Sequence, residues 1–80
     1  MIEHQAEQQR FVLNKDGHEC VLEYLVTGSD IDFTRTYVPF ALRGQGLAEE
    51  LVKAGLAWAD QQQYHKQASC WYVQRYLEAP

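Results

Sequence analysis

The sequence predicts a single α/β domain built on a small, mostly antiparallel sheet. Three segments near the N-terminus have the alternation of strands and are separated by tight turns. One longer segment has the apolar spacing of a helix, and a further short apolar segment follows it. We therefore expect the order βββ-α-β-α in one domain spanning residues 1–80, with residues 1–9 as a flexible lead-in.

The first three strands are expected at residues 10–14, 18–27 and 31–38. Asp16-Gly17 favours a hairpin between the first two, because glycine accepts positive φ at little cost. Alternation in the second strand puts four residues on one face: Cys20, Leu22, Tyr24 and Val26. In the third strand it groups Ile31, Phe33, Arg35 and Tyr37. Short connections make an antiparallel meander the simplest arrangement.

The main helix is expected at residues 47–63, after Pro39 ends the third strand. Its apolar stripe has helical spacing and is formed by Leu47, Leu51, Ala54 and Trp58. A fourth strand is expected around residues 68–71, and residues 72–79 can close the chain as a short helix. The crossover through the main helix predicts that the fourth strand runs parallel to the third.

Charge and composition exclude several classes of protein. Seven Lys and Arg against eleven Asp and Glu give a net charge of −4, which argues against a broad nucleic-acid-binding face. The N-terminus lacks the pattern of a signal peptide, and no apolar run is long enough to span a membrane. We expect a soluble, cytoplasmic protein with Cys20 and Cys70 as thiols, and no metal site, because the histidines lie far apart in the sequence.

The segment of residues 40–51 raises the question of a ligand, because it reads "FALRGQGLAEEL". A two-glycine turn before a helix is common, and this one matches neither a Walker loop nor a full dinucleotide fingerprint. Its position is more informative, since free N–H groups at a helix N-terminus bind anions and glycine lets the ligand approach the backbone. Arg43 adds a positive charge to an otherwise acidic chain.

Three strings together resemble the GNAT superfamily of N-acetyltransferases, and in particular its very small members. The pyrophosphate motif Arg/Gln-x-x-Gly-x-Gly/Ala is matched by Arg43, Gly46 and Ala48, within "LRGQG" and the helix that follows. "RTYVP" and "CWYV" resemble the flanking strings, in the same order and at similar spacing. The resemblance implies acetyl-CoA as cosubstrate, with the pantetheine between the strand ending at Val38 and the segment carrying Cys70. The implied cofactor-binding residues are Val38, Arg43, Gly44, Gln45, Gly46, Leu47 and Ala48.

The chain also departs from the family pattern. Where small relatives carry His and Glu before Val-Pro, this chain has Arg35 and Tyr37, so a proton acceptor at either position is missing. The chain stops at Pro80, where relatives often continue, which can shorten an acceptor pocket.

Cys70 and Tyr72 are the candidate catalytic residues. As a thiolate, Cys70 can accept the acetyl group, and as a thiol it can relay a proton, although a free cysteine on a strand is equally typical of a buried packing residue. Tyr72, like Tyr37, can protonate the leaving thiolate or simply pack. Trp58 and Cys20 are expected in the core, and Trp71 on the strand face opposite Cys70.

The expected function is acetyl-CoA-dependent N-acetyl transfer to a small-molecule or peptide amine, by a monomer or weak homodimer without nucleic-acid or membrane partners. The complete glycine turn and Cys70 favour an enzyme. The alternative is a non-catalytic acyl-CoA-binding or protein-interaction module, which the missing Glu and the short chain favour. A structural protein without a ligand is the third interpretation.

Overall fold

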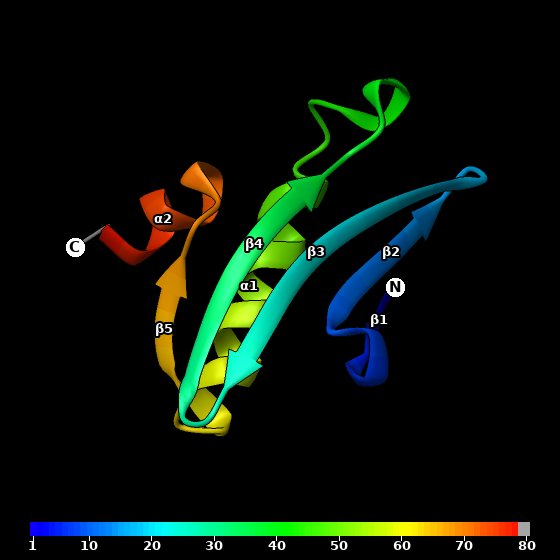
Figure 1. The fold of residues 1–80 in the computed structure, drawn as a ribbon. Helices are drawn as coiled ribbons and strands as arrows, with labels where there is room; N and C mark the ends of the chain where they lie inside the picture. The colour runs from blue at the N-terminus through cyan, green and yellow to red at the C-terminus, as the bar shows by residue number, and fades with distance from the viewer. Residues whose placement is uncertain (79–80) are drawn as a thin grey trace.

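The computed structural model describes residues 1–78, which form five strands and two α-helices, with two short 3-10 helices (Figure 1). The strands are β1 (Ile2–Gln5), β2 (Arg10–Lys15), β3 (His18–Thr27), β4 (Asp30–Tyr37) and β5 (His65–Ala68). The α-helices are α1 (Leu47–Gln61) and α2 (Trp71–Glu78), and the 3-10 helices are η1 (Ala6–Gln8) and η2 (Phe40–Leu42).

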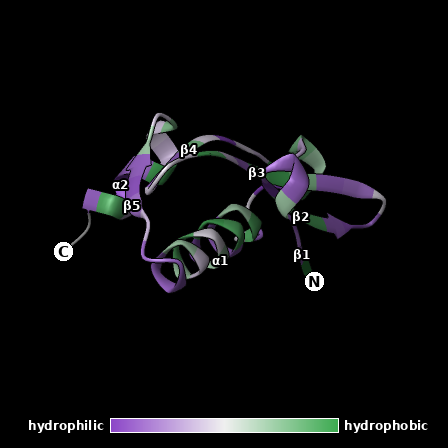
Figure 2. Ribbon diagram, turned by 60° about the horizontal axis from the view of Figure 1, so that its bottom comes forward, coloured by the Kyte–Doolittle hydropathy of each residue, from purple (hydrophilic) through white to green (hydrophobic). Residues whose placement is uncertain are grey.

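The five strands form one sheet in the order β1-β2-β3-β4-β5. Neighbouring strands are antiparallel except β4 and β5, which are parallel and joined through α1. The sheet arches over α1, which lies against its concave face (Figure 2). The predicted fold class, a mostly antiparallel sheet with two helices, is therefore confirmed, with one strand more than expected at the N-terminus.

The core lies between α1 and one face of the sheet. The alternation predicted for β3 holds, since Cys20, Leu22 and Tyr24 are all buried. Gly55 in α1 explains how closely the helix approaches: a Cβ built there would lie 2.6 Å from Leu22 Cδ2 and 3.1 Å from a ring carbon of Phe33. A side chain at position 55 would therefore push α1 away from β3 and β4.

The N-terminal segment differs from the flexible lead-in expected, because residues 2–5 form strand β1 against β2. His4 is the anchor: its ring stacks on Phe11, with centroids 4.0 Å apart, and lies edge-on to Trp58 at 4.5 Å. Its Nε2 also hydrogen-bonds the hydroxyl of Tyr24 at 2.6 Å. These contacts form only in the folded chain, so the polar sequence of residues 1–9 does not predict them.

A β-bulge in β4 overturns part of the predicted alternation. Tyr24 pairs with Phe33 but Glu23 pairs with Arg35, so Thr34 has no partner opposite it in β3. Beyond the bulge, Thr36 pairs with the buried Leu22 and turns toward the α1 side of the sheet. Arg35 and Tyr37, expected on the face of Phe33, instead lie on the outer face and are exposed.

The C-terminal strand and helix also lie earlier in the chain than expected. The predicted strand at residues 68–71 is wrong: β5 ends at Ala68, and Trp71 begins α2. Asp32 helps to end the strand, because its two carboxylate oxygens accept hydrogen bonds from the backbone N and the Oγ of Ser69, each at 2.7 Å. Cys70 consequently lies at the N-terminus of a helix rather than within a strand.

Candidate functional site

The glycine turn, residues 43–46, leads from η2 into α1 with two residues in the left-handed region. Gly44 has φ 86° and Gly46 has φ 77°, conformations that favour glycine. A Cβ at either position would meet no protein atom within 4 Å, so both face open space. Gly46 is also the N-cap of α1 and supplies no side-chain cap, which leaves the N–H groups of the first turn available to an anion.

Arg43 is tied to the end of β4. Its Nε donates a hydrogen bond to the carbonyl oxygen of Val38 at 3.0 Å, and its guanidinium lies 5.8 Å from the ring centroid of Phe40. Glu49, in the first turn of α1, pairs with Lys53 at 3.1 Å instead of with the turn. The positive charge at this end of α1 is therefore held beside the glycines, and the nearby carboxylate is engaged on the helix surface.

β4 runs on past the end of β5, where the chain turns away into α2 (Figure 1). Two adjoining hollows lie in this region. The first, about 380 Å³, lies between the end of β4 and the start of α2. The second, about 270 Å³, lies under the glycine turn. Both are lined by Val38, Arg43, Ala48 and Tyr72.

Most of the residues predicted for the site meet at these hollows. Cys70 lines the first, and Gly44, Gly46 and Leu47 line the second. Gln45 lines neither, and its side-chain oxygen accepts a hydrogen bond from Lys15 Nζ at 2.6 Å. Three segments distant in the sequence, residues 36–38, 43–48 and 70–72, thus converge at the hollows.

Cys70 occupies the N-cap position of α2, where its carbonyl oxygen accepts the hydrogen bond from Gln74 N at 3.0 Å. Burial acts to raise the pKa of its thiol, but the N–H groups of Val73 and Tyr72 and the hydroxyl of Thr36 hydrogen-bond the sulfur and lower it below the ordinary value of 9.0. Such a setting at a helix N-terminus favours a reactive thiolate. Cys20, by contrast, is fully buried, and burial raises the pKa of its thiol.

Tyr72 is suited to hold a proton rather than to lose it. Burial, the hydrogen bond with the Tyr76 hydroxyl at 3.0 Å and the nearby Glu49 carboxylate raise the pKa of Tyr72 to about 12. Its hydroxyl is therefore protonated at neutral pH and can act as a donor.

Thr36 was missed from the sequence, because alternation without the bulge put it on the outer face. Its Oγ1 lies 3.6 Å from the Cys70 sulfur and it lines the first hollow. Trp71 was expected on the face opposite Cys70, yet as the first residue of α2 it lines the same hollow and is 70% exposed. Trp58 is partly buried against the core, as expected.

Within residues 1–78, no group of three His, Cys, Asp or Glu side chains is arranged to hold a metal ion. Neither α-helix in the described part of the chain is long and apolar enough to cross a membrane.

Comparison with known proteins bears on the same segments. A family model described as GCN5-related N-acetyl-transferase matches residues 10–80, which include the glycine turn and both candidate catalytic residues. Protein NATD1 of Gallus gallus is 35% identical over 80 residues, covering 96% of this chain and 73% of that protein. Protein NATD1 of Homo sapiens is also 35% identical, with 96% and 71% covered, and that of Danio rerio is 29% identical, with 96% and 73% covered.

The family match and the fold agree with the resemblance that the three short strings indicated. The turn before α1 and the end of β4 lie within the matched residues. The chain belongs to the GCN5-related N-acetyltransferase family.

Proposed function

We propose that this protein is an acetyl-CoA-dependent N-acetyltransferase. The observation that carries the proposal is that the two hollows share lining residues: one lies at the uncapped helix N-terminus of the glycine turn, and the other lies at the thiol at the start of α2. One end suits an anion and the other holds a nucleophile, which is what a thioester attached to a phosphorylated carrier requires. The predicted cytoplasmic location stays a prediction.

The residues present fit coenzyme A. Its pyrophosphate would lie on the N–H groups of residues 46–48, with the guanidinium of Arg43 beside it. The open space in front of Gly44 and Gly46, where a Cβ would project, is compatible with this close approach. The pantetheine would follow Val38 into the first hollow. When bound, acetyl-CoA supplies the acetyl thioester next to Cys70.

The chain's own groups then have distinct tasks. Backbone N–H groups at the end of β4, near Tyr37 and Val38, would stabilise negative charge on the acetyl oxygen. The Cys70 thiolate would have one of two roles. It would accept the acetyl group as a nucleophile, or it would take the proton of the attacking amine as a base. Tyr72, protonated at neutral pH, would give a proton to the departing sulfur.

A non-catalytic acyl-CoA-binding module is the second candidate function. The lining of the first hollow favours it, since this lining contains no Asp, Glu or His to serve as a general base. Such a protein would bind acyl-CoA at the same glycine turn and the same hollow but would not transfer the acyl group.

Two measurements separate these functions. Coenzyme A titrated into 15N-labelled protein should shift the amides of residues 43–48 most and those near Val38 and Cys70 less; a lack of shifts in this region would overturn both. Acceptor-dependent release of coenzyme A from acetyl-CoA should then exceed the rate in buffer. Binding without any acceptor-dependent release would identify the binding module.

Mass spectrometry after incubation with acetyl-CoA alone would show whether Cys70 carries the acetyl group.

A further inference from the structure

Two exposed aromatic side chains flank the mouth of the first hollow. Tyr37 projects from the outer face of β4 and is 41% exposed, and Trp71 at the start of α2 is 70% exposed. Exposed aromatic surface beside a concave site is a common mark of a recognition surface. Neither ring belongs to the hydrophobic core.

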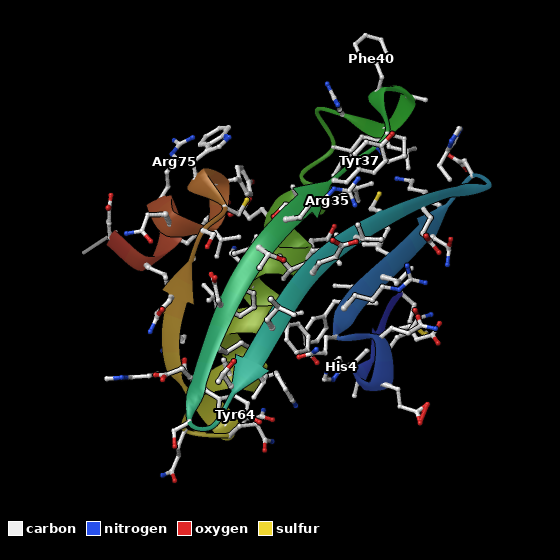
Figure 3. The ribbon with its side chains drawn as sticks, in the orientation of Figure 1. His4, Arg35, Tyr37, Phe40, Tyr64 and Arg75 are labelled. Carbon is white, nitrogen blue, oxygen red and sulfur yellow. The ribbon has the colours of Figure 1, made fainter. Side chains whose placement is uncertain are left out.

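Each of these rings is accompanied by an arginine. The guanidinium of Arg35 lies 5.2 Å from the ring centroid of Tyr37, and that of Arg75 lies 5.9 Å from the ring centroid of Trp71. Figure 3 shows Arg35 beside Tyr37 at the end of β4, and Arg75 on α2. Arg35 is paired with Glu23 at 3.1 Å, so the positive charge offered beside these rings is that of Arg75.

The carboxylates nearest to the mouth are engaged with other groups. Glu23 pairs with Arg35 at 3.1 Å, and Asp32 accepts the two hydrogen bonds of Ser69. Glu49 lines the second hollow, under the glycine turn, and pairs with Lys53. A cationic amine entering the first hollow would meet the guanidinium of Arg43 and no negative side chain among the lining residues.

This lining is poorly suited to lysine or a polyamine. An alkyl ammonium with a pKa of about 10.4 must lose a proton before it can attack, and a base is then needed close to the nitrogen. An amine attached directly to an aromatic ring is a much weaker base, because its lone pair is delocalised into the ring. It is already neutral at neutral pH, so it needs no carboxylate or imidazole.

The transfer step balances without such a base. The neutral amine nitrogen forms a bond to the acetyl carbon, and the carbon–sulfur bond breaks with its electron pair leaving on sulfur. Tyr72 gives its hydroxyl proton to that departing thiolate and regains a proton from the nitrogen. The products are an N-aryl acetamide and a thiol.

Resting on the proposed function, we propose that the acetyl acceptor is an aromatic amine that carries an acid group. Its ring would contact Tyr37 and Trp71, and its acid group would meet the guanidinium of Arg75. Uncharged aromatic amines would be weaker acceptors, and lysine derivatives the weakest.

The direct test compares three acceptors at saturating acetyl-CoA near pH 7.5: 4-aminobenzoate, aniline and Nα-acetyl-lysine. We expect kcat/KM for 4-aminobenzoate to exceed that for the lysine derivative at least tenfold, with aniline between them. Because the amines of 4-aminobenzoate and aniline are both neutral from about pH 7 to 9, any change in rate over this range should be the same for the two acceptors. Equal or faster transfer to Nα-acetyl-lysine would overturn the inference while leaving acetyl transfer established.

Variants at the mouth locate the effect. Trp71→Ala should raise KM for both aromatic amines, whereas Arg75→Gln should lower kcat/KM for 4-aminobenzoate several-fold and leave aniline unchanged. Leu25→Ala is the matched control, since Leu25 is also an exposed apolar side chain, 54% exposed, but lies toward the other end of β3 opposite Asp32. An effect of Leu25→Ala equal to that of Trp71→Ala would place the acceptor elsewhere.

A binding measurement separates this inference from the failure of the proposed function. If no acceptor supports turnover, 4-aminobenzoate should still shift the indole N–H signal of Trp71 in coenzyme A-loaded protein, and Arg75→Gln should weaken that binding. Binding without turnover would overturn acetyl transfer and retain the aromatic acid as the ligand of this mouth. Neither binding nor turnover would overturn both.

Discussion

The Cys70 sulfur lies 3.6 Å from the Oγ1 of Thr36, and this contact joins the first turn of α2 to the end of β4. It exists because of the bulge at Thr34, which turns Thr36 toward the α1 side of the sheet. Without that irregularity, position 36 would face outward and the sulfur would lose a partner. A local defect in β4 thus sets the chemical environment of the candidate nucleophile.

Replacing Thr36 by Val should make Cys70 less reactive. The hydroxyl helps to lower the pKa of the thiol, so its removal raises that pKa and reduces the thiolate fraction at neutral pH. A loss of about 1 kcal/mol corresponds to roughly fivefold slower alkylation by iodoacetamide at pH 7.

The matched control for this variant is Thr34→Val, because the Thr34 hydroxyl donates to the carbonyl oxygen of Glu23 at 3.3 Å and not to the sulfur. Its alkylation rate should stay close to that of the parent. Equal rates for the parent and Thr36→Val would show that backbone groups, and not the Thr36 hydroxyl, activate Cys70.

Gly46→Ala should weaken coenzyme A binding at least tenfold. The new Cβ would project into the space in front of α1, where the pyrophosphate would lie, and φ of 77° adds a backbone cost of about 1–2 kcal/mol. Calorimetric titration with coenzyme A measures the effect.

Gly28→Ala controls for the backbone cost in that experiment. Gly28 also has positive φ, 60°, and open space around its Cβ, but it lies in the turn between β3 and β4. Similar loss of stability in both variants, with loss of affinity only at position 46, is the expected result. Loss of affinity in both would point to a general effect on the fold.

Periodicity and turn chemistry were sufficient to predict the strands β2 to β4, the helix α1 and the glycine turn. They were not sufficient where a residue distant in the sequence determines the local structure. The bulge at Thr34 depends on the register with β3, and the early end of β5 depends on Asp32 holding Ser69. The prediction that site residues from the turn and from Cys70 converge needed only the topology, so it survived the misplaced strand.

His4 should make the fold less stable in mild acid. Burial lowers the pKa of His4 below its ordinary value of 6.5, so the unfolded chain binds a proton more readily than the folded one. The stabilisation is present above about pH 6.5, the pKa of the unfolded chain, and is lost as the pH falls below it toward the lower pKa of the folded state. Urea unfolding of the parent near pH 5.5 should therefore give a lower free energy than near pH 7.5.

His4→Gln isolates this contribution, since other groups titrate in both proteins. The variant should be less stable at pH 7.5, because it loses the stacking on Phe11, and should show a smaller difference between the two pH values. An unchanged pH difference would mean that His4 does not titrate with unfolding.

Cys70→Ala and Cys70→Ser together separate the chemical role of this residue from its structural one. Alanine removes the N-cap of α2 and should cost about 1 kcal/mol of stability, whereas serine is a good N-cap and should restore it. Both should bind coenzyme A nearly as the parent does, because the phosphates are held at the glycine turn.

Both variants should reduce acetyl transfer at least tenfold, equivalent to about 1.4 kcal/mol of barrier, because neither provides a thiolate. In the parent, iodoacetamide should modify Cys70 before the fully buried Cys20, and bound coenzyme A should protect it. An unchanged transfer rate in Cys70→Ser would reduce Cys70 to a helix cap, and Tyr72 would become the first residue to test for proton donation.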